Sequence, residues 1–241
     1  MRNSKFIAIL PFILLCGCSN DTPGTDAATS HIVGPPVTAR AAEVPPANPE
    51  LDPANETSTL PNNASWRMGD SVLALMGDLH GRTVADLFAG DGYYTWKLLD
   101  AGARVLAMDD DTSHVATLLA AKKAKGISDD RLLIRLSSTG RPVLLPAEAD
   151  MALITRELST IPDRDAWFKQ VQRGLRGHKP TYVVNFLPQP SPIGPPAGQR
   201  MDYNSAADVL TAVGYTDISI LYRKIPYRYI LFASIPPVQP D

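Results

Sequence analysis

The chain has little cysteine: only Cys16 and Cys18 in 241 residues, both close to the N-terminus. The body of the chain therefore has no cysteine for a disulfide or a thiolate metal site. Its four histidines are scattered, with no pair at the spacing of metal ligands. These absences argue against a disulfide-stabilised module and against a zinc site, so we expect no bound metal.

The chain also lacks a strong charge of either sign. Its formal net charge is −2, and its basic residues are dispersed along the sequence. Nucleic-acid binding domains usually gather their basic residues on one face to hold phosphates. We therefore expect no nucleic-acid partner.

The apolar run near the N-terminus is too short to span a bilayer. It has about ten residues, ends at Leu15 and follows two basic residues, as in the apolar region of an export signal. The motif that follows resembles the lipobox of bacterial lipoproteins, where the cysteine after a small residue is lipidated. Cys18 follows Gly17 and fits better than Cys16, so we expect residues 1–18 to be a lipoprotein signal peptide. An ordinary secretory signal cleaved nearby is the alternative.

The likeness to Gram-negative lipoproteins also implies a location. Ser19 follows the lipidated cysteine and favours sorting to the outer membrane, with the domain facing the periplasm. The acyl chains would supply the membrane affinity. Residues 19–63 are rich in Pro, Ala, Thr and Asn, and we expect a disordered tether there, followed by one domain over 64–236 and a tail over 237–241.

Strand-like and helical segments alternate through residues 64–236. We expect strands at 83–89, 104–108, 131–136, 150–155, 181–187, 216–222 and 227–235, and helices at 66–79, 92–101, 112–125, 164–176 and just before Gly214. Asp111 and Asp163 are the expected N-caps of the third and fourth helices.

The spacing of these segments predicts the topology. The last two strands are about four residues apart, too close for a parallel crossover, so they must form an antiparallel hairpin. The other strands alternate with helices and must be parallel. We predict an α/β, Rossmann-like three-layer sandwich whose seven-stranded sheet is mostly parallel, with an antiparallel strand in its C-terminal hairpin.

The most informative segment is D-L-F-A-G-D-G-Y-Y-T, from Asp86 to Thr95. Two glycines between a strand and a helix are typical of a nucleotide-binding turn. Thr95 stands where a dinucleotide motif needs its third glycine, and the acidic residues of the turn would repel a pyrophosphate. A cationic or zwitterionic ligand such as S-adenosylmethionine suits the turn better. A two-glycine turn that binds nothing is the plain alternative.

Asp109 ends the second expected strand, about 19 residues after Gly90. Ligands of parallel sheets bind where the strands end, and a carboxylate at this spacing can accept hydrogen bonds from both ribose hydroxyls. Asp109 is thus the candidate ribose ligand, although the acidic run from Asp109 to Asp111 is also a plausible helix cap.

These motifs together resemble class I S-adenosylmethionine-dependent methyltransferases, and more narrowly exported predicted members of that group. The similarity covers essentially the whole domain and continues through Trp167-Phe168, Leu175–Gly177, Val183–Pro188, Gly194–Arg200 and Pro226–Tyr229. The resemblance implies a seven-stranded sheet with the reversed strand between the fifth and sixth. It further implies that Asp86, Ala89, Gly90 and Gly92 line the methionine moiety and that Asp109 holds the ribose. Other expected cofactor-binding residues on this edge are Phe88, Asp91, Tyr93, Asp110 and Ser137.

The acceptor side departs from the resembling group. Phe88 replaces the first glycine of the commoner motif, residues 154–160 replace a segment with histidines, and Gln199-Arg200 replaces His-Arg. Methyl transfer needs few catalytic side chains. The candidates here are Glu157, which would accept a proton, and Asn185 and Arg200, which would orient an acceptor. Each also has a structural alternative, such as solvation or packing.

The sequence favours an enzyme, a membrane-anchored lipoprotein that transfers methyl groups from S-adenosylmethionine to a small or lipid-like acceptor and acts as a monomer. The alternative is a catalytically inactive lipoprotein that keeps the fold as a binding or scaffolding module, because the methyl donor is made in the cytoplasm. A nicotinamide-dependent oxidoreductase is a third hypothesis, weakened by the missing glycine and the acidic turn.

Overall fold

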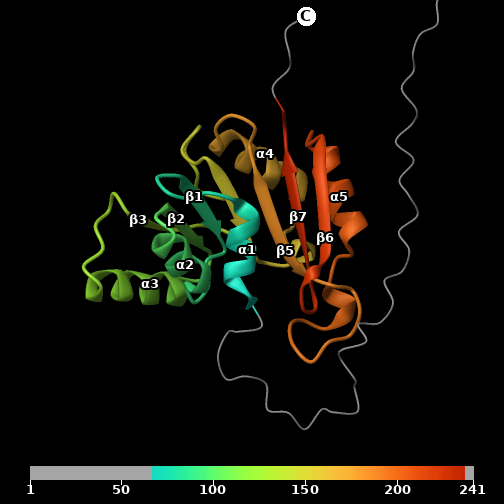
Figure 1. Cartoon of the computed structure of the whole chain (residues 1–241), viewed down its shortest axis with the longest axis horizontal. Helices are drawn as coiled ribbons and strands as arrows, with labels where there is room; N and C mark the ends of the chain where they lie inside the picture. Colours follow the sequence, from blue (N-terminus) through green and yellow to red (C-terminus); the bar gives the residue numbers. More distant parts are fainter. Residues whose placement is uncertain (1–66, 237–241) are drawn as a thin grey trace, which may run out of the picture. The chain divides into compact units, whose positions relative to one another are not determined.

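The computed structural model describes residues 67–236, and Figure 1 shows the arrangement of their helices and strands. The expected signal peptide, the whole expected tether and the C-terminal tail lie outside the described residues. The strands are β1 (Thr83–Leu87), β2 (Arg104–Asp109), β3 (Leu132–Leu136), β4 (Met151–Ile154), β5 (Thr181–Phe186), β6 (Asp217–Ile225) and β7 (Arg228–Ser234). The helices are α1 (Gly69–Met76), α2 (Tyr93–Asp100), α3 (Thr112–Ala124), α4 (Arg164–Gly174) and α5 (Tyr203–Ala212), with 3₁₀ turns η3 (Leu158–Thr160) and η4 (Ala197–Gln199).

The seven strands form one sheet in the order β3-β2-β1-β4-β5-β7-β6. β1 pairs in parallel with β2 and β4, and β7 runs antiparallel between β5 and β6. The predicted α/β fold, with its reversed strand between the fifth and sixth, is therefore confirmed. β1 lies between strands that come from different parts of the chain, so the ends of β2 and β4 both flank the glycine turn.

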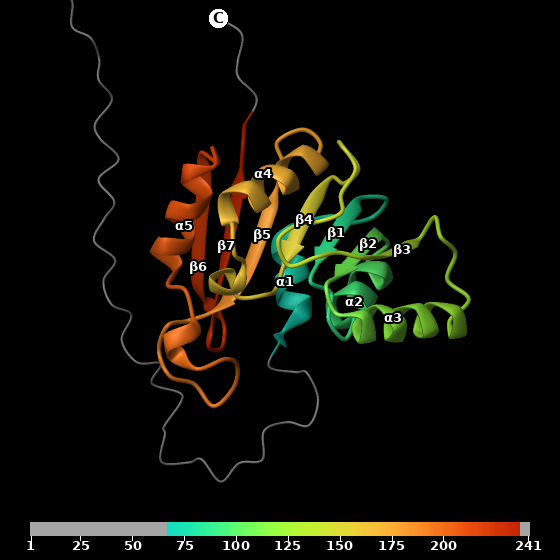
Figure 2. The ribbon, with the colours of Figure 1, turned by 180° about the vertical axis from the view of Figure 1, so that it is seen from behind.

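Alternation along the strands divides the interior into two cores. Ala85 and Leu87 of β1 pack with α4 and α5, while Val84 packs with α1, α2 and α3 on the other face. Figures 1 and 2 show the two helical layers from opposite sides. A strand buried on both faces needs apolar side chains at most positions, which β1 provides except at Thr83 and Asp86.

The helix caps follow the prediction. Asp111 accepts a hydrogen bond from the Ser113 backbone N–H at 2.7 Å, and Asp163 accepts one from Ala166 at 3.1 Å. These bonds satisfy amides at the start of α3 and α4 that have no partner within the helix.

The last hairpin is tighter than predicted. β6 continues to Ile225 instead of ending at residue 222, and a register shift lies between Leu221 and Ile225. An irregularity of this kind lets a strand resume pairing after a local kink. Among residues 67–236, no helix combines the length and apolar character needed to cross a bilayer.

Candidate functional site

The turn between β1 and α2 keeps its backbone in the left-handed region at alternate residues. Phe88, Gly90 and Gly92 have φ of 66°, 57° and 82°. A Cβ on Gly92 would lie 2.6 Å from Leu118 and 2.7 Å from the Trp96 indole nitrogen, so glycine is required there. Gly90 has no neighbouring atom within 4 Å of the position of a Cβ, so its bare backbone faces open space that a ligand can reach.

Phe88 adopts the strained backbone of the turn without being glycine. Its ring is 7% exposed and stacks on Trp167 of α4, with centroids 5.6 Å apart and planes 10° apart. The ring therefore packs into the core beneath α4 and does not fill the space beside Gly90. Phe88 touches the predicted site mainly through its backbone, because its side chain belongs to the core.

A buried carboxylate lies directly beneath the turn. Asp86 is completely buried; one oxygen accepts a hydrogen bond from the Thr95 hydroxyl at 2.6 Å, and the other has no hydrogen-bond partner among the described residues. Burial, together with the nearby charges of Asp109 and Asp91, raises the pKa of Asp86 to about 7. A cation bound here would favour the ionised carboxylate.

Asp109 lies at the end of β2 and is 1% exposed. Its carboxylate accepts hydrogen bonds from the backbone N–H groups of Gly90 at 2.7 Å and Asp111 at 2.9 Å. The His114 ring nitrogen Nδ1 is 3.0 Å from the same carboxylate. A carboxylate has about four lone-pair sites, so these three contacts leave about one for a further donor. The bond to Gly90 draws the predicted ribose ligand and the glycine turn together.

Asp110 pairs with a residue that the sequence had not singled out. Arg156 follows β4 and donates to both carboxylate oxygens of Asp110, each at 2.6 Å, while the Thr139 hydroxyl also bonds Asp110. These hydrogen bonds, those of Arg156 foremost, lower the pKa of Asp110. The Arg156 guanidinium also lies 3.9 Å from the centroid of the Phe88 ring. The pair thus joins the ends of β2 and β4 across the end of β1.

The backbone of the segment after β4 is held by Asn185, a residue predicted to orient an acceptor. Asn185 is fully buried, accepts from the Leu158 backbone N–H at 3.0 Å and donates to the Arg156 carbonyl at 2.7 Å. Its amide therefore fixes the backbone on either side of Glu157. An acceptor-orienting role for Asn185 stays a prediction.

Glu157 points into the interior between β4 and β5. One carboxylate oxygen accepts from the Phe186 backbone N–H at 2.6 Å, and the other is buried with no hydrogen-bond partner among the described residues. Burial raises the pKa of Glu157, and a higher pKa makes a carboxylate a better proton acceptor. The predicted proton-accepting role of Glu157 remains untested, and its surroundings are compatible with it.

Arg200 organises the Pro-rich loop that leaves β5, orange in Figure 1. Its guanidinium donates to the carbonyls of Leu187, Gln189, Ile193 and Pro195. The loop also packs Gly194 against Phe186, where a Cβ would lie 2.5 Å from the ring. Arg200 is thus engaged with the loop backbone, and any contact with an acceptor is a further prediction.

The remaining predicted residues lie around the same edge. Tyr93 accepts from the Gly69 backbone N–H at 3.1 Å and so ties α2 to α1. Asp91 pairs with Arg67 at 2.7 Å, and the Ser137 backbone N–H donates to the Asp109 carbonyl at 2.8 Å. Ala89 is buried and donates to the Met108 carbonyl at 2.9 Å. The structure therefore brings the predicted cofactor residues together at the ends of β1, β2 and β3.

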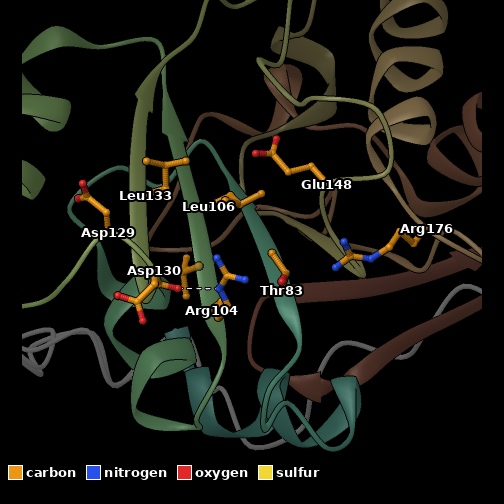
Figure 3. Close-up of a pocket in the computed structure, with 9 residues that line it drawn as sticks. Thr83, Arg104, Leu106, Asp129, Asp130, Leu133, Glu148 and Arg176 are labelled. Atoms are coloured by element: carbon orange, nitrogen blue, oxygen red, sulfur yellow. Dashed lines mark hydrogen bonds between the residues drawn. The ribbon is translucent and has the colours of Figure 1, made fainter.

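A separate hollow of about 270 Å³ lies at the opposite end of the strands. Figure 3 shows Thr83 and Arg104, the first residues of β1 and β2, at its wall. Two of its charged lining residues are in ion pairs: Arg176 bonds Asp150, and Glu148 bonds Arg135. Ligands of parallel sheets bind where strands end, so this hollow is not the candidate site.

Comparison with solved structures gives the fold a name. No protein-family model matches the sequence. A SAM-dependent methyltransferase from Aquifex aeolicus superposes with a TM-score of 0.63 over 69% of this chain and 89% of its own, at 16% identity. The [4+2]-cyclase SpnF gives 0.60 over 73% and 83%, at 14% identity. Phosphoethanolamine N-methyltransferase 2 from Haemonchus contortus, solved with S-adenosylhomocysteine, gives 0.60 at 14% identity over 72% of this chain, which spans only 53% of that enzyme.

These likenesses establish the fold, which is that of class I S-adenosylmethionine-dependent methyltransferases. The resemblance read from the glycine turn and the closing hairpin therefore leads to the correct architecture. The presence of a cyclase among the similar structures shows that this fold also carries other chemistry. Activity must be argued from the site.

Proposed function

We propose that the chain binds S-adenosylmethionine and transfers its methyl group to a small or lipid-like acceptor. The observation that carries the proposal is the buried Asp86, whose second oxygen has no hydrogen-bond partner within residues 67–236 and whose neighbours Asp91 and Asp109 are also acidic. Asp91 is already paired with Arg67, so the carboxylates of Asp86 and Asp109 are the ones that would attract a cation and repel a pyrophosphate. A sulfonium and an ammonium on one ligand match this charge.

The residues present fit that ligand. Asp86, Ala89, Gly90 and Gly92 would hold its methionine part, with Asp109 at the ribose and Ser137 toward the base. Open space beside Gly90 lets the ligand lie against the backbone. When bound, S-adenosylmethionine supplies an already activated methyl group, so the protein's task is to place the acceptor in line within a dry pocket. Glu157 would take the acceptor's proton.

The full chain should bind S-adenosylmethionine and S-adenosylhomocysteine at least tenfold more tightly than NADH, because the acidic turn disfavours a pyrophosphate. Isothermal titration calorimetry at constant salt measures all three ligands. Tighter binding of NADH would contradict the proposal and favour an oxidoreductase.

The second candidate is a methyltransferase-like module without activity. Two observations favour it. Asn185 and Arg200 already donate hydrogen bonds to backbone carbonyls, and a cyclase has the same fold. Binding of S-adenosylhomocysteine without methylation of envelope lipid or small-molecule extracts, followed with a labelled methyl group, would support this candidate.

We also propose that the protein is a monomeric lipoprotein of the cell envelope, anchored at Cys18 in the outer membrane and facing the periplasm. The proposal rests on the sequence motif of residues 15–18 and on Ser19. In cells given an alkyne-labelled fatty acid, the full chain should incorporate the label. Cys18→Ala should abolish incorporation because the acyl chains would have no attachment site. Cys16→Ala is the matched control and should keep the label; the reverse pattern would contradict lipidation at Cys18.

A further inference from the structure

The contact between Arg156 and Asp110 spans the end of β1, beside the site described above. Phe88 is the first residue after β1, and the Arg156 guanidinium is 3.9 Å from its ring centroid. From there the guanidinium reaches the carboxylate of Asp110 with two hydrogen bonds of 2.6 Å. β2 and β4 both pair with β1, so a bond from one to the other must pass over the end of β1.

Several features stabilise the contact between Arg156 and Asp110. Paired hydrogen bonds between a guanidinium and a carboxylate are stronger than single ones and fix the geometry. Both side chains are mostly buried, at 27% and 13% exposure, so solvent screens the pair only in part. The Thr139 hydroxyl holds Asp110 from the β3 side, and Asn185 holds the Arg156 carbonyl.

Asp109, the next residue to Asp110, is also committed to partners within the protein. It accepts from two backbone amides and lies within hydrogen-bonding distance of His114, which leaves about one lone-pair site. One ribose hydroxyl would need that remaining site. The ends of β1, β2 and β4 are thus bonded to one another where a nucleoside would have to enter.

We infer that Arg156, Asp110 and Phe88 form a latch that closes the nucleoside site and must open before a ligand reaches Asp109. This inference rests on the proposed function for the identity of the ligand. Opening breaks the Arg156–Asp110 pair and lifts the guanidinium from the Phe88 ring. The measured association constant is then the intrinsic association constant multiplied by the fraction of molecules in which the latch is open.

Arg156→Ala should therefore bind S-adenosylhomocysteine about tenfold more tightly than the wild-type full chain, as expected if about one molecule in ten is open. Asp110→Asn breaks the same pair from the other side and should act in the same direction. Raising the salt concentration should tighten binding to the wild type, because salt weakens the ion pair, and should have little effect on Arg156→Ala. Calorimetry measures each affinity.

Arg135→Ala is the matched control. Arg135 also makes a two-point contact with a carboxylate, that of Glu148, at 2.5 and 2.6 Å, and the two side chains are similarly buried. Its other partner is the Val143 carbonyl on the connection between β3 and β4. The control should leave the affinity for S-adenosylhomocysteine unchanged. Equal or weaker binding by folded Arg156→Ala and Asp110→Asn would overturn the latch.

Amide hydrogen exchange without ligand separates failure of the latch from failure of the proposed function. A latch predicts faster exchange at residues 86–92 and 155–158 in Arg156→Ala and Asp110→Asn than in Arg135→Ala. If no protein binds S-adenosylhomocysteine but exchange is faster, the proposed function fails and the latch stands. Unchanged exchange in both latch variants overturns the latch, whichever ligand binds.

Discussion

Asp109→Ala should both weaken the fold and remove most of the affinity for S-adenosylhomocysteine. Asp109 is 1% exposed and accepts hydrogen bonds from Gly90 and Asp111, so alanine would leave two amides without their acceptor. Each of these partly exposed hydrogen bonds contributes about 0.5–1.5 kcal/mol, so we expect the free energy of unfolding to fall by about 1–3 kcal/mol. Affinity should fall at least tenfold, the loss of a charge-assisted hydrogen bond to ribose.

Urea denaturation and calorimetry, performed where both proteins are folded, measure the two effects separately. Asp111→Ala is the control, because Asp111 is an exposed N-cap of the same acidic run. It should lose about 1 kcal/mol of stability and keep its affinity. Asp109→Ala with unchanged affinity would show that Asp109 is structural and does not hold the ligand.

Asp86→Asn should stabilise the free protein and remove its preference for a cationic ligand. The pKa of Asp86 is raised to about 7 in the folded state from 3.8, so the folded protein binds this proton more tightly than the unfolded chain. Its contribution to stability is therefore neutral below pH 4 and becomes unfavourable as pH rises toward 7. At 1.36 kcal/mol for each pKa unit, the full effect above pH 7 is about 4 kcal/mol.

The stability gain of Asp86→Asn should thus be close to zero at pH 4 and about 2–4 kcal/mol at pH 8, measured by urea denaturation. Asp150→Asn is a control of opposite sign. Burial alone would raise the pKa of Asp150, but hydrogen bonds from Arg176 and the Thr83 backbone lower it. Its replacement should therefore destabilise the protein above pH 4. A constant difference between wild type and Asp86→Asn across this pH range would contradict the prediction.

The same carboxylate should set the choice between the two nucleosides. S-adenosylmethionine carries one positive charge more than S-adenosylhomocysteine, so its relative affinity should rise as Asp86 ionises through pH 7. In Asp86→Asn this pH dependence should disappear. Under the proposed function, stability and binding are linked, because the group that destabilises the free protein is the one that would receive the cation.

The sequence by itself determined the architecture and singled out the edge of the sheet that carries the candidate site. Alternating apolar residues set the strands, the short gap before β7 required an antiparallel hairpin, and Asp111 and Asp163 marked the starts of two helices. The glycine turn and the spacing to Asp109 identified the edge where a ligand would bind. These features are local, because they depend on neighbouring residues and on short distances along the chain.

Only the tertiary structure decided how the side chains at that edge are used. Arg156 and Asp110 are 46 residues apart and meet because β1 separates their strands in the sheet. The Asn185 amide hydrogen-bonds the segment after β4, and Arg200 donates to carbonyls of its own loop. The Phe88 ring turns toward Trp167 because the core beneath α4 accepts it. Partners drawn from different strands are chosen by the order of the sheet, which no local pattern in the sequence records.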